Sequence, residues 1–157
     1  MSFELGQAVL AGLIGTIAMT VVMYMGSMMG MKMDMPMTLG TMFLPKGATA
    51  WTVGLMLHLM MGIIFFLVYA GLIDAFGIRL GVAGWTALFG AIHAIAIGPA
   101  FGMMPMLHPR MATGPEAASD RVPAPGFMGL KMGMMGPMGI IAAHVVYGLV
   151  AGAVYAV

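Results

Sequence analysis

Apolar residues run through the chain in four long stretches, and the segments between them carry most of the charge. Each stretch is long enough for a helix to cross about 30 Å of hydrocarbon at 1.5 Å of rise per residue. We expect transmembrane helices over residues 5–29, 51–73, 80–104 and 137–157. The connections over 30–50 and 105–136 are predicted to be loops rich in methionine.

The composition argues against a soluble domain. Of the 157 residues, 62% are apolar and only 7% are charged, whereas a soluble domain carries about 25% charged residues. The predicted fold is therefore all-α: an integral membrane four-helix bundle that forms one membrane domain over residues 1–157. The net charge of +1 gives no footprint for nucleic acid. The lipid bilayer is the predicted partner.

Basic residues are distributed unevenly between the two sides of such a bundle. The two loops carry five of the six Lys and Arg residues, and the opposite side carries only Arg79 and the amino terminus. Because basic residues favour the cytoplasmic side of membrane proteins, we expect both loops in the cytoplasm. The first stretch lacks the basic region and cleavage site of a signal peptide, so it is expected to remain as a helix.

The second and fourth stretches share a pattern. His-x-x-x-Gly followed by Val-Tyr-Ala occurs over residues 58–70 and again, with the same internal spacing, over 144–156. The first and third stretches share Ala-Gly near their starts, at 11–12 and 83–84. Because histidine is rare inside membrane spans, the recurrence predicts two helical hairpins related by duplication. Such halves would be parallel repeats about an axis along the membrane normal.

Three histidines are predicted to lie at one depth in the bilayer. His58 and His144 lie about seven residues inside their spans and His93 about eleven, or roughly 10–17 Å from the loop side at 1.5 Å per residue. Met19 in the first span reaches a similar level. Small residues flank the histidines at helical spacing, so these polar groups should face the inside of the bundle. Imidazole combined with thioether suits copper, and we expect these four residues to form an inner soft-metal site.

Methionine is the most unusual feature of the composition, with 23 residues. Alternating thioethers in the first loop are typical of a segment that captures Cu(I). The predicted outer ligands are Met31, Met33, Met35, Met37 and His108. Methionine is also a flexible apolar filler, and cysteine would be the stronger ligand in a reducing cytoplasm. Simple packing is therefore the alternative to copper capture.

Two other functions fit the same histidines. His58 and His144, each followed four residues later by glycine, are candidate axial ligands of a haem b, with the glycines leaving room for the ring. Alternatively, the histidines join helices in a non-catalytic accessory or assembly subunit of a larger membrane complex or homo-oligomer. The sequence contains no phosphate-binding loop, nucleophile elbow or His-Glu-x-x-His motif, so we do not expect an enzyme. The absence of cysteine excludes thiolate metal sites.

Three segments together resemble a known family. They are the run from Ala11 to Thr20, the segment from Met33 to Met42, and the two His-x-x-x-Gly helices that end in Tyr-Ala. In these segments the chain is similar to small bacterial four-helix membrane proteins of unknown function. The resemblance covers most of the chain except residues 112–126. It implies a multi-pass protein of the bacterial inner membrane and supplies no activity.

Overall fold

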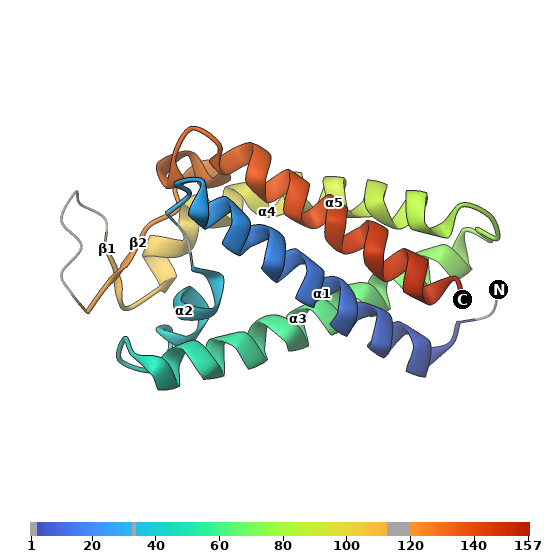
Figure 1. Ribbon diagram of the computed structural model, residues 1–157, viewed down its shortest axis with the longest axis horizontal. Coiled ribbons are helices and arrows are strands. Elements are labelled where there is room, and N and C mark those ends of the chain that lie inside the picture. Colours follow the sequence, from blue (N-terminus) through green and yellow to red (C-terminus); the bar gives the residue numbers. More distant parts are fainter. Residues whose placement is uncertain (1–2, 33, 113–119) are drawn as a thin grey trace. The chain divides into compact units, whose positions relative to one another are not determined.

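The computed structural model describes residues 3–32, 34–112 and 120–157, which are mostly helical. Four helices are long and apolar enough to cross a membrane. They are α1 (Leu5–Met28), α3 (Ala48–Ala75), α4 (Val82–Leu107) and α5 (Gly136–Tyr155) (Figure 1). Each end lies within three residues of the predicted one. The prediction of a small polytopic membrane protein with four candidate spans is confirmed.

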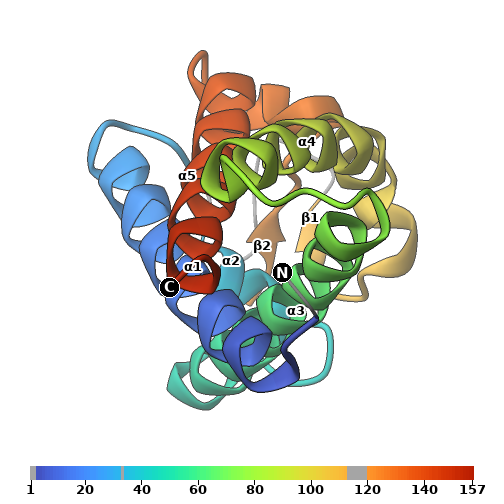
Figure 2. The ribbon, with the colours of Figure 1, turned by 90° about the vertical axis from the view of Figure 1, so that its right-hand side faces the viewer.

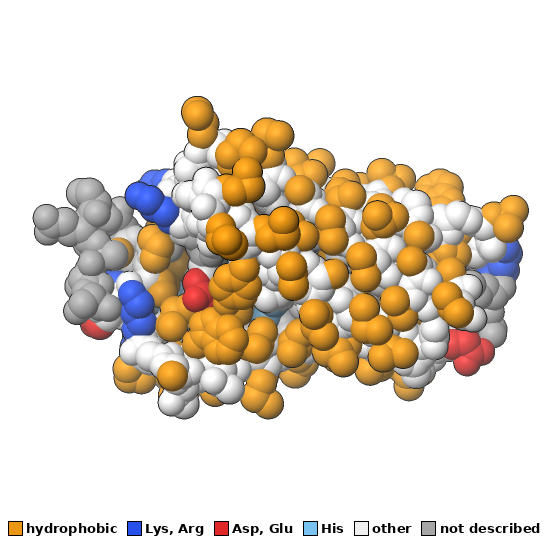
Figure 3. All heavy atoms as spheres, viewed as in Figure 1, with side chains coloured by type: hydrophobic (Ala, Val, Ile, Leu, Met, Phe, Trp, Pro, Cys, Tyr) orange, Lys and Arg blue, Asp and Glu red, His pale blue; other side chains and the backbone are white. Residues whose placement is uncertain are grey.

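The four long helices are apolar on their exposed faces as well as on their packed ones. Large hydrophobic side chains such as Ile17, Val21 and Ile64 are about half exposed, and hydrophobic side chains cover much of the visible face of α1 and α5 in Figure 3. A helix that is hydrophobic all round suits lipid, where each backbone polar group must be satisfied within the helix. The exposed faces are therefore suited to hydrocarbon.

The described residues form two compact units. Unit 1 comprises the described residues within Met1–Val22, Leu59–Ala94 and Ile141–Val157. Within it, segments of α1, α3, α4 and α5 pack as a four-helix bundle, which Figure 2 shows nearly end on. The bundle includes the tight turn between α3 and α4, where Asp74 and Arg79 approach to 3.7 Å. The predicted four-helix fold is confirmed in this unit.

Thr16 and Thr86 mark two close helix crossings in unit 1. The Thr16 hydroxyl fills the space over Gly62, so α1 lies directly against α3. The backbone of Thr86 fills the space over Gly148, and its hydroxyl donates to the Gly148 carbonyl at 2.7 Å, so α4 lies against α5. Both threonines are buried. Gly62 and Gly148 hold the same position in the sequence repeat, and each lies where its helix crosses a neighbour, although the Thr86 hydroxyl itself lies over Gly152.

The Ala-Gly pairs of the first and third spans have different surroundings. Gly12 is buried against Ile63 of α3, whereas Gly84 has open space around it. Only one of the two Ala-Gly glycines therefore lies at a helix crossing. Duplication of the hairpin remains a prediction.

Unit 2 comprises the described residues within Met23–His58 and Ile95–Ile140. Its connecting segments contain short elements that the sequence analysis did not predict: α2 (Met35–Gly40), β1 (Met111–Ala112), β2 (Val122–Pro123) and the 3-10 helix η1 (Phe127–Met132). Asp34 starts α2, because its carboxylate accepts the Met37 N–H at 3.0 Å. The two strands pair in parallel, with Met111 opposite Val122. The predicted loops are thus partly ordered by capping and by this small ladder.

Candidate functional site

Two of the predicted histidines meet in unit 1. His93 on α4 and His144 on α5 have ring centroids 5.1 Å apart, with their planes at 73°. His144 is buried and His93 is half-buried. Gly90, three residues before His93, allows this approach, because a Cβ at that position would collide with the His144 carbonyl. The small-residue face of α4 therefore brings the two imidazoles together.

His93 is also held from α3. The Tyr69 hydroxyl lies 3.0 Å from Nδ1 of His93, and the Phe65 ring lies over the imidazole at 4.2 Å between centroids. A hydrogen bond at one ring nitrogen fixes the orientation of the ring and presents the other nitrogen to a ligand. Nε2 of His93 is therefore the candidate metal-binding atom. Tyr69 was not among the predicted site residues, although it belongs to the repeated Val-Tyr-Ala pattern.

A cluster of aromatic side chains adjoins the histidine pair through Tyr69, which contacts His93. Tyr69 meets Tyr147 edge to face at 5.8 Å, and Phe66 contacts both tyrosines at 6.1 and 6.4 Å. The Tyr147 hydroxyl donates to the Gly62 carbonyl at 2.5 Å. Both tyrosines are less than 5% exposed. Burying a charged side chain in such surroundings would cost more than burying a neutral one.

Met19 lies at the same level of the bundle as His144. It is 7% exposed on α1, one turn beyond Gly15, which packs against Tyr147 and Ala151 of α5. Because α1 and α5 run in opposite directions (Figure 1), one turn onward on α1 corresponds to one turn back on α5, the level of His144. Unit 1 therefore contains three of the four predicted inner ligands. The fourth, His58, is buried on the part of α3 that belongs to unit 2.

The glycines assigned to a haem are covered by neighbouring helices. Thr16 fills the space over Gly62, and Thr86 fills the space over Gly148. The expectation that these glycines leave room for a porphyrin ring is therefore wrong, because both serve as helix crossings. Ligation of a haem by His58 and His144 stays a prediction without that support.

His108 forms a hydrogen bond near the carboxyl end of α2 in unit 2. Its Nε2 lies 2.8 Å from the Thr38 carbonyl, and its Nδ1 accepts the Arg110 N–H at 3.1 Å. The Arg110 guanidinium donates to the Thr41 carbonyl at 3.2 Å. These bonds satisfy carbonyl groups that the last turn of a helix leaves without partners. Since both ring nitrogens are engaged, a metal at His108 would have to break one of these bonds.

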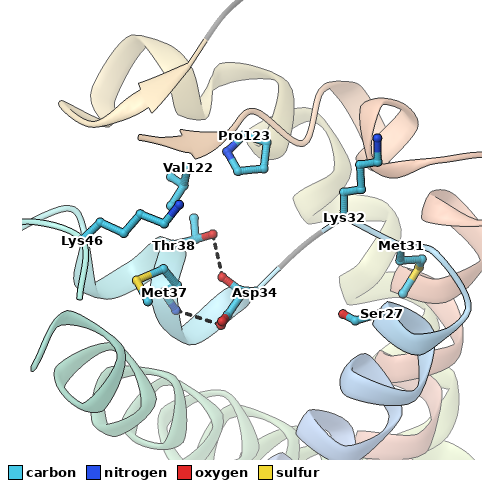
Figure 4. A pocket seen from close by; sticks show the side chains of 9 residues that line it. All are labelled: Ser27, Met31, Lys32, Asp34, Met37, Thr38, Lys46, Val122 and Pro123. Carbon is cyan, nitrogen blue, oxygen red and sulfur yellow. Dashed lines mark hydrogen bonds between the residues drawn. The ribbon is translucent and has the colours of Figure 1, made fainter. Parts of the chain in front are cut away.

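The predicted outer methionines lie in unit 2. Met31 and Met37 line a pocket of about 370 Å³ (Figure 4). Met35 is the first residue of α2, and Met33 lies outside the described residues. Met37 also packs against the buried cluster of Met111, Val122 and Ala124. At least one of these methionines therefore contributes to packing, as the alternative interpretation expected.

Within the described ranges, no group of three or more His, Cys, Asp or Glu side chains is arranged to hold a metal ion. A metal centre in unit 1 would therefore rest on two imidazoles and a thioether, a donor set suited to soft ions. In comparisons with known proteins, no family model, curated protein or solved structure matches the chain.

Proposed function

We propose that this protein binds Cu(I) within the membrane, with His93 and His144 as imidazole ligands and Met19 as a thioether ligand. The observation that carries this proposal is the separation of 5.1 Å between the two ring centroids. Two imidazoles that share one ion, each nitrogen about 2 Å from it at a tetrahedral angle, bring their centroids to roughly 5 Å. The observed spacing is close to this value, which supports an ion shared by the two rings.

The choice of Cu(I) follows from charge and softness. All three proposed ligands are neutral, so they leave the charge of the ion uncompensated in an apolar bundle. A monovalent ion has the smallest cost of burial, which grows steeply with charge. Thioether and imidazole together favour copper over the harder divalent ions. With Nε2 on the ion, Nδ1 of His93 would carry the proton and donate it to the Tyr69 hydroxyl, which lies 3.0 Å away and would orient the ring.

We also propose that the methionines of the first loop make transient contact with the ion before it enters the bundle. Met31 and Met37 line a pocket, but Lys32 and Lys46 share its wall and repel a cation. The contact is therefore brief. Replacing both methionines by leucine should slow copper loading while leaving the final copper content unchanged. Loading at an unchanged rate would assign these methionines to packing alone, since leucine fills a similar volume.

The competing function is a non-catalytic accessory or assembly subunit in which the histidines only join helices. The Tyr69–His93 hydrogen bond and the two bonds of His108 favour it, because each has a structural role without metal. Such a subunit would co-purify with a larger membrane complex and remain metal-free. The protein as a copper binder would instead retain the ion when purified alone.

Equilibrium copper binding tests the proposal. The purified protein is loaded with Cu(I) under anaerobic, reducing conditions and titrated with a chromogenic Cu(I) chelator. We expect a single ion per chain, lost in both His93→Gln and His144→Gln. His108→Gln is the matched control, because it changes a histidine in unit 2 and keeps a donor for the Thr38 carbonyl. A preparation that stays empty after loading would refute the proposal. A red preparation with a Soret band would favour the haem alternative.

A further inference from the structure

The pocket in unit 2 has a charge pattern that copper does not explain. Its volume is about 370 Å³, and its lining includes two cations, Lys32 and Lys46, and one acid, Asp34. The rest of the wall is largely apolar, from two methionines, a valine and a proline (Figure 4). We propose that this pocket holds the phosphate headgroup of an anionic membrane lipid.

Charge selects an anion at this position. The Asp34 carboxylate already accepts the Met37 N–H at 3.0 Å as the cap of α2. Lys46 reaches the Arg121 carbonyl at 3.5 Å, which engages only one of the three donors of an ammonium group. The lining therefore has two ammonium groups and one carboxylate, which give it a net charge of +1. Such a pocket attracts a phosphate and repels a metal cation.

The position of the pocket in the chain selects a lipid over a free anion. Ser27 of the lining lies in the last turn of α1, and Lys46 lies two residues before α3 begins. Ends of membrane-spanning helices lie at the level of the lipid headgroups, where lysine side chains reach the phosphates. Basic pockets at this level bind anionic headgroups. The apolar wall would cover the glycerol and the first acyl carbons, which inorganic phosphate lacks.

Lipid titration of the intact protein tests the assignment. The protein in detergent, free of metal, is titrated with phosphatidylglycerol, and bound lipid is counted by native mass spectrometry. We expect Lys32→Gln or Lys46→Gln to weaken binding roughly 5-fold and the double variant roughly 30-fold. Lys131→Gln is the matched control, since this lysine is exposed and outside the pocket lining. It should bind like the wild type.

A variant that is expected to bind the lipid more tightly distinguishes a loss of lipid recognition from a loss of folding. Asp34→Asn removes the acid but keeps a side chain that caps helices equally well. It should therefore tighten phosphatidylglycerol binding, which a damaged fold would not do. Equal affinity of the double lysine variant and the wild type would overturn the proposal, as would phosphatidylcholine binding as tightly as phosphatidylglycerol. Lysine-dependent binding of inorganic phosphate without binding of lipid would also overturn it and assign the pocket to a free anion.

Discussion

The Tyr69 hydroxyl lies 3.0 Å from Nδ1 of His93, and this contact joins α3 to α4 inside unit 1. Tyr69 is only 4% exposed, so the bond forms away from water. Within the bundle it has two consequences. It links the two helices, and in the proposed copper site it would leave Nε2 of His93 to bind the ion.

Replacing Tyr69 by phenylalanine removes only the hydroxyl. We expect Cu(I) affinity to fall roughly 10-fold, because a group that orients a histidine ligand typically contributes this much to metal affinity. Tyr155→Phe is the matched control, since its hydroxyl accepts the Glu4 N–H near the end of the chain. Chelator titration measures both. Unchanged affinity in a folded Tyr69→Phe protein would remove this tyrosine from the site.

The two glycine crossings should be the most sensitive positions of the bundle. Gly62→Ala and Gly148→Ala would each force a methyl group into the space that Thr16 or Thr86 fills, so each should cost about 1–3 kcal/mol of stability. Thermal unfolding in detergent measures the loss. Gly71→Ala, where a Cβ meets open space, is the control and should change little. Similar stability of all these variants would contradict the crossing geometry.

His108→Ala should loosen α2 without affecting copper. The substitution removes the donor to the buried Thr38 carbonyl and the acceptor of the Arg110 N–H, at a cost of about 1–3 kcal/mol. Faster amide hydrogen exchange over Met35–Gly40 would report it. His108→Gln should retain most of the protection, because its amide group can still donate. Loss of bound copper in His108→Ala would contradict the assignment of this residue to capping.

Much of the bundle could be predicted because its signals are local in the sequence. Span lengths follow from uninterrupted apolar runs, and the small-residue faces at Gly62 and Gly148 follow from helical spacing. The meeting of His93 and His144 could be expected from depth and facing. The role of Tyr69 could not be predicted. A tyrosine near the end of a span is usually a packing residue, and its partner on the neighbouring helix is not visible in the sequence.

The segments between the spans were less predictable for a physical reason. The fold of α2 depends on one cap at Asp34 and on bonds from His108 and Arg110, which lie about 70 residues away in the chain. The β1–β2 pair involves two residues on each strand, too few to leave a periodic pattern. The two lysines that line the pocket come from opposite ends of the first connecting segment. The number of charged residues in a segment does not predict that a cavity forms between them.

The orientation inferred from basic residues can be tested by fusions. With five of six Lys and Arg in the loops, the carboxyl terminus should lie outside the cytoplasm. An alkaline phosphatase fused after Val157 should therefore be active, and a green fluorescent protein fused there through a standard linker should not fluoresce. The same reporters inserted near residue 116 should give the opposite result. A fluorescent green fluorescent protein and an inactive alkaline phosphatase at the carboxyl terminus would contradict this orientation and indicate the opposite one.

X-ray absorption at the copper edge of the loaded protein tests the central claim most directly. The claim predicts a Cu(I) edge and a first shell of two imidazole nitrogens at about 2.0 Å and one sulfur at about 2.3 Å. Met19→Leu should lose the sulfur contribution, and the His93→Gln, His144→Gln double variant should retain no copper. A shell made only of sulfur, or the same spectrum in the double variant, would contradict copper binding by His93 and His144.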